Sequence, residues 1–423
     1  MHVVMFADQH VESLGGAQVS MRLQRRFLER AGHTVTVVAP RMHRPVPADT
    51  AYVDLPSIPV TPDREYALSW PGIRTDRFVD AAMAGRPPVD VVHVQADFWG
   101  AFIGHRYAAR HGLPVVHTMH NRVDVGIEAT APFPGLVLRV LNAWARRALR
   151  RAIPGRGGEG GHDGWAYLRR LARLSTAVTA PSAHFARRLE AHGALPAGGS
   201  ASGVGSASGS GRAPATGVGT ASGVDVVWNG IDDDILDAAL AAGPAGRRPG
   251  RPRFVWIGRM SPEKRLLPFL EAVAASGIDA DVEVIGGGAQ LRTARRLVER
   301  SRPVASIRFS GRMPYAQTLE RLAEADAVVQ TSIGFETQGM TVFEAASLGT
   351  PAVVSDPDIA AELGAGVWSV PDATVLALAE ALRRASADIA AGSPVAVDPT
   401  IGERFRQSSR TAAMVEVYER VRA

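Results

Sequence analysis

One lysine stands among the 47 basic residues of this 423-residue chain, and its type and place suggest phosphate chemistry. This residue, Lys264, follows Arg259 by five positions. An ammonium group is a compact point charge that fits a crowded phosphate site, whereas a guanidinium prefers a flat, bidentate partner. Composition alone leaves two interpretations about even, because a single lysine also falls somewhere by chance. The neighbouring residues must decide between them.

The residues around Lys264 are typical of a strand, a sharp turn and a helix start. Phe254–Ile257 is strand-like, Gly258-Arg259 is expected to turn at its end, and Ser261-Pro262-Glu263 resembles a helix cap and first turn. Such an arrangement directs Arg259, Lys264 and the first helical amides towards one place. Two cations and a helix start suit a diphosphate. The alternative is a solvated basic turn.

Two glutamates, Glu336 and Glu344, form a second group with Gly339 between them. On one helix their eight steps of about 1.5 Å would separate them by about 12 Å. A glycosidase pair needs about 5 to 9.5 Å, so that chemistry is disfavoured. We instead expect Glu336 in a loop, Glu344 in the first turns of a helix, and the amides of residues 339–341 between them. Both carboxylates then accept hydroxyl hydrogen bonds from one polyhydroxylated ligand. The alternative for Glu344 is a structural carboxylate.

Strand-like and helical segments alternate along the chain, which predicts an α/β fold with parallel sheets covered by helices. The length favours two domains. The expected strands of the two halves are Val3–Ala7, Thr34–Ala39, Val89–Val94, Pro114–Thr118 and Val224–Trp228, then Arg253–Ile257, Asp281–Ile285, Ser306–Phe309, Ala327–Gln330 and Pro351–Val354. Such sheets bind ligands at the carboxyl ends of their strands, where this chain has small or polar residues.

The domain boundaries follow from composition. We expect a first domain over residues 1–237, with flexible insertions at 154–164 and 196–223 because these segments are rich in small residues. A hinge between Asp237 and Arg251 leads to a second domain over residues 251–400, and residues 401–423 close the chain as a helix.

Composition also excludes several classes of function. The chain has no cysteine, so thiolate metal sites and cysteine nucleophiles are impossible. The net charge of +5 suggests affinity for polyanions or an anionic membrane face, but aromatic residues are only 6% and do not interleave with the arginines, so nucleic acid is not expected. Neither a signal peptide nor a run long enough to span a bilayer is recognised, which makes a cytoplasmic location the expectation.

These motifs together resemble a retaining GT-B glycosyltransferase of family 4. The residues that carry the resemblance are Gly15-Gly16 after the first strand, Asn229-Gly-Ile-Asp232, Gly258-Arg259 with Lys264, and the Glu336/Glu344 pair with Gly339, which matches the EX7E motif. The resemblance covers nearly the whole chain. It implies two Rossmann-like doubly wound domains that face each other across a cleft, with residues 1–237 binding the acceptor and 251–400 the donor. The last helix would cross back to the first domain.

The resemblance also implies roles for individual residues. Arg259 and Lys264 would bind the donor diphosphate and stabilise charge on the leaving nucleotide. Glu336 would hold the sugar hydroxyls and Glu344 the ribose hydroxyls. The remaining implied donor contacts are Gly258, the amides of Gly339, Met340 and Thr341, the turn at Met313 for the base, Gly15 and Gly16 beneath the transferring group, and His120, which would face the donor sugar.

The implied chemistry is a front-face substitution in which the leaving phosphate helps to deprotonate the acceptor, so no protein nucleophile is needed. The co-substrate is a UDP- or GDP-hexose of the glucose or mannose type, and no cofactor or obligatory metal is expected. Asp232-Asp233-Asp234 is interpreted as a hinge loop rather than a metal site. Trp228 stands where the family usually has proline. His93 is a further candidate to face the cleft, whereas His105 and His117 are expected to have packing or surface roles.

The acceptor is indicated by residues 135–152, which read as a basic amphipathic helix with a tryptophan. Such a helix suits an anionic membrane surface, and packing on the first sheet is an equally good interpretation. The string Glu336-Thr-Gln-Gly-Met-Thr also resembles transferases of glycolipid biosynthesis that act on diacylglycerol-type lipids. A membrane-lipid acceptor and a peripheral position at the inner face of the cell membrane are therefore expected. The alternatives are a soluble sugar or cell-envelope precursor as acceptor, and a binding protein without turnover.

Overall fold

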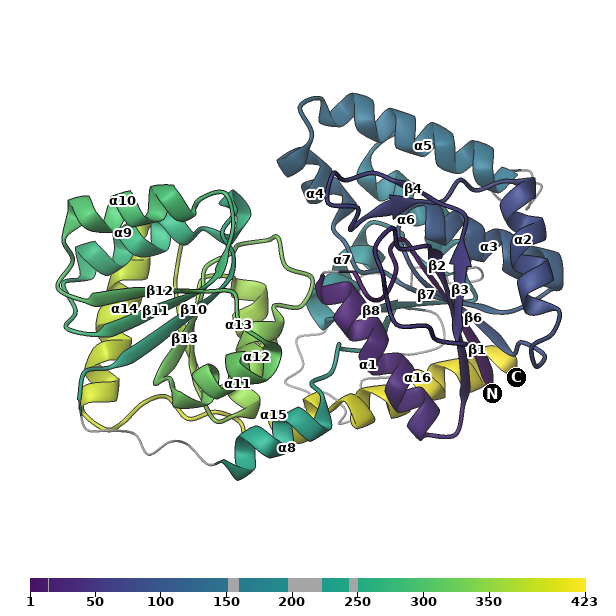
Figure 1. Ribbon diagram of the computed structural model, residues 1–423. Coiled ribbons are helices and arrows are strands. Elements are labelled where there is room, and N and C mark those ends of the chain that lie inside the picture. The colour runs from purple at the N-terminus through teal and green to yellow at the C-terminus, as the bar shows by residue number, and fades with distance from the viewer. Residues whose placement is uncertain (14, 151–159, 197–222, 243–249) are drawn as a thin grey trace. The chain divides into compact units, whose positions relative to one another are not determined.

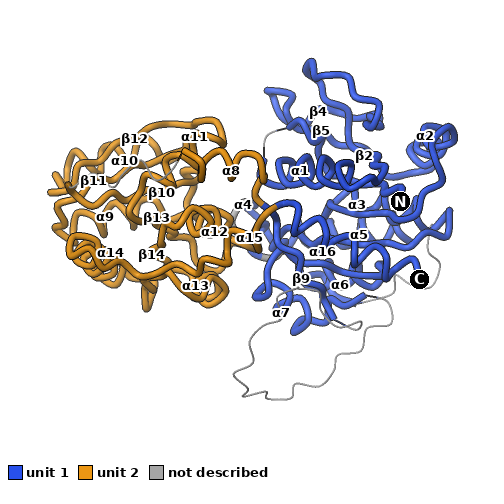
Figure 2. The backbone as a smooth tube through the Cα atoms, turned by 90° about the horizontal axis from the view of Figure 1, so that it is seen from below, with its two compact units in different colours: residues 1–230, 407–423 blue, residues 231–406 orange. Residues whose placement is uncertain are grey.

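The computed structural model describes residues 1–13, 15–150, 160–196, 223–242 and 250–423. The chain divides into two compact units, unit 1 with residues 1–230 and 407–423 and unit 2 with residues 231–406 (Figure 2). The expected insertions at 154–164 and 196–223 lie mostly outside the described residues. A cleft between the units remains a prediction.

Unit 1 contains a seven-stranded parallel sheet in the order β3-β2-β1-β6-β7-β8-β9 (Figure 1). Its strands are β1 (His2–Ala7), β2 (Thr34–Pro40), β3 (Tyr52–Leu55), β6 (Val91–Gln95), β7 (Val115–Thr118), β8 (Ala177–Ala180) and β9 (Asp225–Val226). A short antiparallel pair, β4 (Ile58–Pro59) and β5 (Ala67–Leu68), lies outside this sheet. Most of the sheet strands are buried on both faces, as parallel sheets require.

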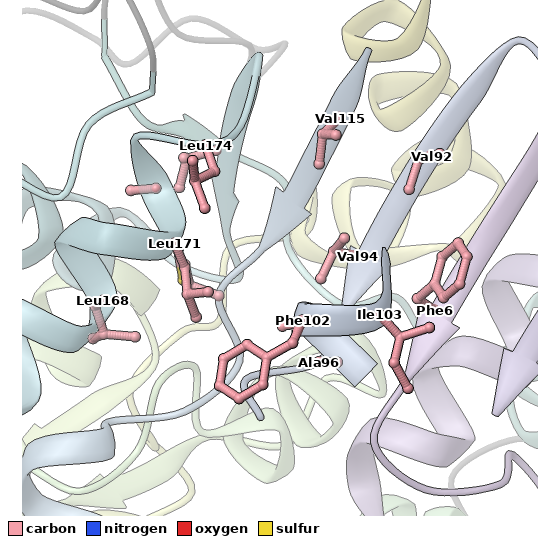
Figure 3. Packing of buried hydrophobic residues seen from close by; sticks show 14 of the residues in the cluster. Phe6, Val92, Val94, Ala96, Phe102, Ile103, Val115, Leu168, Leu171 and Leu174 are labelled. Carbon is pink, nitrogen blue, oxygen red and sulfur yellow. The ribbon is translucent and has the colours of Figure 1, made fainter. Parts of the chain in front are cut away.

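Alternate side chains of the strands supply the two cores of unit 1. Phe6 of β1 packs under one set of helices (Figure 3), and Val4 belongs to the same core, whereas Val3 and Met5 face the other set. The first set comprises α2 (Ile73–Met83), α3 (Trp99–His111), α4 (Val123–Thr130), α5 (Pro134–Arg150), α6 (Gly164–Ala172) and α7 (Ala183–Ala191). On the opposite face α1 (Gly16–Arg30) packs beside α16 (Gln407–Arg422) (Figure 1).

Unit 2 contains a six-stranded parallel sheet in the order β12-β11-β10-β13-β14-β15. Its strands are β10 (Arg253–Arg259), β11 (Asp281–Gly287), β12 (Ser306–Gly311), β13 (Ala327–Gln330), β14 (Ala352–Val354) and β15 (Val367–Ser369). One core lies beneath α9 (Leu266–Ser276), α10 (Leu291–Ser301) and α14 (Val375–Ala390). The unit also holds α8 (Asp233–Ala241), the 3-10 turn η1 (Pro262–Lys264), α11 (Tyr315–Glu324), α12 (Met340–Ser347), α13 (Pro357–Leu363) and α15 (Ile401–Phe405). The expectation of two doubly wound parallel sheets is confirmed.

The contacts place the boundary between the units at residue 230, earlier than the expected 237. The Ile231 amide donates to the Phe405 carbonyl at 2.7 Å, and Asp237 of α8 pairs with Arg406 at 2.7 Å. These contacts join residues 231–237 to unit 2. The expected closing helix is also divided, because Arg406 has an extended ψ of 140° between α15 and α16. Only α16 therefore belongs to unit 1.

The strand order reverses direction once in each sheet, between β1 and β6 in unit 1 and between β10 and β13 in unit 2. The loops that follow these strands must diverge to opposite faces, which leaves a crevice at their carboxyl ends. The loops after β10 and β13 carry Lys264 and Glu336, and those after β1 and β6 carry Asp8 and Asp97. The fold therefore selects these loops as candidate sites.

The backbones of β10 and β11 approach each other closely at Gly286, which leads to a testable prediction. Gly286 has a φ of 127°, and a methyl group on it would overlap the carbonyl oxygen of Gly258. We expect Gly286→Ala to lower the free energy of unfolding by about 3 kcal/mol or more, because it adds a clash to backbone strain. The control is Gly277→Ala, with a φ of 65° but open space around it, which should cost about 1 kcal/mol. Chemical denaturation measures both variants, and equal losses would contradict the prediction.

Candidate functional site

The ion pair between Lys264 and Glu336 joins the two loops at the crevice of unit 2. The Lys264 ammonium donates to Oε1 of Glu336, which also accepts from the Ser332 hydroxyl at 2.7 Å. Their side chains are 24% and 18% exposed, so the pair is largely enclosed yet reachable from solvent. Lys264 also lies over the ring of Phe335, 5.7 Å from its centroid. The charge of the lysine is thus held in place before any ligand binds.

The backbone of Lys264 is anchored from beneath by the core. The Thr331 hydroxyl donates to the Lys264 carbonyl at 2.6 Å and accepts from the Trp256 indole at 2.9 Å. Trp256 is buried in β10, and Thr331 follows β13 directly. These two hydrogen bonds link Lys264 to β10 and to the end of β13, the strands on either side of the crevice. The position of Lys264 is therefore determined by the rigid sheet.

Arg259 has a different environment from Lys264. Its side chain is 66% exposed, and its guanidinium lies 3.0 Å from Oε1 of Glu263 and 3.2 Å from the Ser261 hydroxyl. The two cations thus have separate carboxylate partners. Arg259 is the last residue of β10, with Gly258 before it, so the strand continues through the expected turn. An exposed arginine on a short ion pair can exchange that partner at little cost.

The segment from Glu336 to Glu344 has the arrangement expected from the sequence. Glu336 lies in the loop, and α12 begins at Met340 and includes Glu344 in its second turn. Gly339 has a φ of 76°, and a methyl group on it would lie 2.7 Å from Cδ1 of Ile359. The first amides of α12, at Met340 and Thr341, have no partner within the helix. They are therefore available to an anion or to sugar oxygens.

Glu344 is buried and belongs to a small polar group with Tyr315. The Tyr315 hydroxyl donates to Oε1 of Glu344 at 2.9 Å. Burial raises the pKa of Glu344 to about 7, against the lowering effect of this hydrogen bond, and burial with the glutamate charge raises the pKa of Tyr315. Met313 lies two residues before Tyr315 and is partly exposed. Tyr315 was not among the residues selected from the sequence, because no spacing identifies it.

The candidates of unit 1 lie at the carboxyl ends of its central strands. Gly15 precedes α1 and Gly16 begins it, whereas His120 follows β7. Nε2 of His120 lies 3.3 Å from Oε1 of Gln95, and burial lowers the pKa of His120 to about 4. The ring is therefore neutral at pH 7. The structure places these residues in a different unit from Lys264, and their common role remains a prediction.

Two carboxyl groups that the sequence analysis did not select meet at the crevice of unit 1. Asp8 accepts from the amides of Asp97 and Gly100 at 2.7 and 2.8 Å, which caps α3. Burial raises the pKa of Asp8 to about 6. Burial and the charge of Asp8 raise the pKa of Asp97 to about 8, and Asn121 donates to Asp97 at 2.5 Å. Asp8 directly follows the expected strand Val3–Ala7, and Asp97 lies three residues after the expected strand Val89–Val94, so both positions could have been selected from the sequence.

Three other expectations have structural outcomes. His93 is fully buried in β6, so it does not face solvent. His105 and His117 pack as expected, with a 3.1 Å contact between their rings. Asp232 caps α8 by accepting from the Asp234 amide at 3.1 Å, which gives this acidic run a structural role. The ring of Trp228, which replaces the usual proline, lies 5.2 Å from the guanidinium of Arg410.

Helix α5 has a packing face and a separate exposed apolar face. Its buried side chains include Leu138, Leu141, Ala145 and Leu149, whereas Val137 and Val140 are exposed. The other exposed apolar residues near its start are Phe133 and Leu136. The sheet therefore does not use all the apolar surface of this helix. None of the described helices is both long and apolar enough to cross a membrane.

Comparisons with known proteins indicate the family of the chain. A model described as Glycosyltransferase Family 4 matches residues 14–198, and one described as Glycosyl transferases group 1 matches residues 243–389. Together the two models span most of the chain. No curated protein sequence matches it.

Several solved structures resemble the whole chain. HepE from Anabaena in complex with UDP-glucose has a TM-score of 0.61 at 16% identity, covering 99% of this chain and 100% of that chain. Sucrose-phosphate synthase from Thermosynechococcus elongatus has a TM-score of 0.65 at 16% identity, covering 99% of each chain. The lipopolysaccharide outer core galactosyltransferase WaaB has a TM-score of 0.61 at 14% identity, covering 99% of this chain and 100% of that chain. At such identities the similarity shows the fold alone.

The pKa of Glu344 generates a prediction about stability. The folded carboxyl keeps its proton up to about pH 7, whereas the unfolded carboxyl loses it near 4.5. Its contribution to stability is therefore complete below pH 4.5 and is lost as the pH rises through 7. Relative to Glu344→Gln, the unfolding free energy of the unmodified protein should fall by roughly 3 kcal/mol over this range. Urea denaturation at several pH values measures the difference, and the exposed Glu271→Gln provides the control. A difference independent of pH would contradict the prediction.

Proposed function

Since the chain belongs to the group 1 glycosyltransferases of family 4 and the GT-B fold, we propose that it transfers a hexose from a nucleotide diphosphate sugar to an acceptor hydroxyl with retention of configuration. The observation that carries this proposal is the meeting of Lys264 and Glu336 at the crevice of unit 2. Glu344 and the first amides of α12 belong to the same unit.

The paired charges suit the two parts of a sugar diphosphate. The ammonium of Lys264 has hydrogens beyond the one given to Glu336, so it binds a phosphate oxygen while still near the carboxylate. Glu336 accepts a sugar hydroxyl in return. Arg259 leaves Glu263 for the second phosphate, since its present pair is exposed and weak. The two cations then stabilise the charge that develops on the leaving diphosphate.

Glu344 is proposed to bind the ribose hydroxyls. A carboxylate accepts from both hydroxyls at once, whereas a protonated carboxyl accepts less well. With a pKa of about 7 in the free protein, the group changes form near neutral pH, and two donating hydroxyls favour its ionised form. Retention is proposed to follow from front-face attack, assisted by the leaving phosphate and without a protein nucleophile. No obligatory metal or cofactor is proposed.

The first donor to test is a UDP-hexose, because HepE, a structural relative, was solved with UDP-glucose. GDP-hexoses remain in the test. We propose a membrane lipid as the acceptor and a position at the inner face of the cell membrane. This rests on the exposed residues Phe133, Leu136, Val137 and Val140 of the α5 region together with Arg139, Arg147 and Arg150. An exposed apolar strip beside arginines suits an anionic bilayer surface.

Lys264→Ala tests the donor site. We expect turnover to fall by about three orders of magnitude, because one of the two diphosphate cations is lost while the fold is kept. Lys264→Arg should recover only part of the activity, since a fork does not replace a point charge here. Mass spectrometry of products after incubation with UDP- and GDP-hexoses and a membrane lipid extract measures turnover. Arg292→Ala, an exposed change on α10, is the control.

The outcomes separate the alternatives. Near-normal activity of Lys264→Ala would contradict the role of Lys264. Donor hydrolysis without a glycolipid product would favour a soluble sugar or envelope precursor as acceptor. Binding of donors without turnover by the unmodified protein would favour a non-catalytic nucleotide-sugar-binding protein.

The double variant Val137→Asp/Val140→Asp tests the membrane surface. We expect its binding to vesicles of phosphatidylcholine with phosphatidylglycerol to weaken at least tenfold, because two apolar contacts become charges that the lipid repels. Binding of the unmodified protein should weaken as salt is raised. Leu376→Asp, at a more exposed apolar site on α14 of unit 2, is the control. Co-sedimentation measures binding, and equal binding of all three proteins would exclude α5 as the contact.

A further inference from the structure

The hairpin of β4 and β5 in unit 1 has an exposed apolar face. Ile58 of β4 lies opposite Leu68 of β5, so their side chains are on the same side of the hairpin. Val60 and Trp70 each lie two positions from this pair and follow the same alternation. The side chains of Ile58, Val60 and Trp70 are each more than half exposed to solvent. We call these three residues the hairpin face.

Hydrogen bonds hold the hairpin in place before any partner binds. The amide of Ala67 in β5 donates to Oε1 of Gln9 at 2.9 Å, which joins the hairpin to the loop after β1. The hydroxyl of Ser69 donates to the carbonyl of Pro56 at 3.0 Å and closes the base of the hairpin. A preorganised element that keeps large apolar side chains in water is typical of an interaction surface.

Two stacked tryptophans join the hairpin face to α5. The ring of Trp70 stacks on that of Trp144 in α5, with centroids 5.3 Å apart and planes at 29°. Trp144 in turn packs edge-on against Phe102 of the core, also at 5.3 Å. The exposed Val137 and Val140 precede Trp144 by two turns and one turn of the same helix, so they share its face. The exposed apolar strip of α5 therefore leads to Trp70 and continues onto the hairpin.

The charged residues near the hairpin face favour an anionic partner. Three arginines of the hairpin and of α2 are exposed, namely Arg64, Arg74 and Arg77. Glu65 is buried and pairs with Arg44 at 2.9 Å. Asp76 is buried and pairs with Arg106. In residues 56–78, all of which the structure describes, Asp63 is the remaining carboxylate. Apolar side chains beside excess positive charge suit the surface of an anionic bilayer.

We propose that the hairpin face enters the headgroup region of an anionic bilayer beside the exposed strip of α5, and that the Trp70–Trp144 stack joins both into one contact surface. The role of α5 rests on the proposed function, which gives the hairpin no part. A single helix on a bilayer leaves the unit free to roll about the helix axis, and a second element beside it prevents this rotation. Tryptophan suits the headgroup level, because its ring is apolar and its N–H is polar.

Because the chain has no cysteine, one fluorescent label can report on one position. The variants Ile58→Cys, Val137→Cys and Val304→Cys each carry a nitrobenzoxadiazole group and are mixed with vesicles of phosphatidylcholine and phosphatidylglycerol. Val304 of unit 2 is the control, since its exposure of 60% is close to the 67% of Ile58. We expect the emission to shift to the blue at positions 58 and 137 and to stay unchanged at 304.

The labels separate this inference from the proposed function. A shift at position 137 without one at 58 would overturn the inference and leave the α5 contact standing. No shift at either position would overturn both membrane contacts, whereas an equal shift at 304 would show that the label itself enters the lipid and would remove the support for the hairpin. None of these results depends on turnover.

Unlabelled variants test the same surface by affinity. Ile58→Asp/Val60→Asp should weaken vesicle binding at least about tenfold in co-sedimentation, and Trp70→Ala should weaken it more than Trp70→Phe does. Val304→Asp is the control. The midpoints of thermal unfolding should stay unchanged for the aspartate variants, because the altered side chains are exposed. Unchanged vesicle binding of the double variant would overturn the inference. Dimers of the unmodified protein in the absence of lipid that the double variant does not form would also overturn it, in favour of a second copy of the chain.

Discussion

The reversal of strand order in each parallel sheet is the constraint on which the candidate site depends. Chains that leave β10 and β13 must turn to opposite faces, which leaves a crevice at the carboxyl ends of these strands. Trp256 and Thr331 hold the two strand ends together, and Lys264 is attached to this pair through its carbonyl. A long, flexible side chain thus begins from a fixed point. The ion pair with Glu336 holds the other end of this side chain, and both charged groups stay partly exposed to solvent.

A second feature of the candidate site is that each of its cations is balanced by a carboxylate. Each cation that is proposed to bind phosphate already has a carboxylate partner, Glu336 for Lys264 and Glu263 for Arg259. Without these carboxylates, the two cations would repel each other and would bind any anion from solution. A ligand that brings both hydroxyls and phosphates can satisfy the carboxylate and the cation together, whereas a simple anion satisfies only one. The arrangement therefore favours a sugar diphosphate over free phosphate.

The sequence predicted most of the fold because its strands are short apolar runs with clear ends. All ten expected strands are present, whereas β3, β4, β5, β8 and β15 were not predicted. These five strands have two to four residues each, and a hydrophobic period is hard to recognise in so short a segment. The spacing of Glu336 and Glu344 placed them correctly in a loop and a helix. Contacts between residues far apart in sequence, such as Tyr315 with Glu344 or Gln95 with His120, could not be predicted, because no local sequence pattern indicates them. The compact units divide at residue 230, whereas composition suggested 237, because α8 joins unit 2 through contacts with α11 and Arg406, which are distant in sequence.

The division of unit 1 into two stretches of chain has a consequence for the order of folding. Met414, Val417 and Tyr418 of α16 complete the core beneath α1, and these residues are made only after all of unit 2. Unit 2 is one continuous segment, so it can fold as soon as it has been synthesised. Until α16 has been synthesised, it cannot cover its part of the unit 1 sheet beside α1, and the apolar side chains there are exposed. A growing chain must therefore keep this surface from aggregation for the time that about 180 further residues take to be made, roughly 10 to 40 seconds at bacterial and eukaryotic rates.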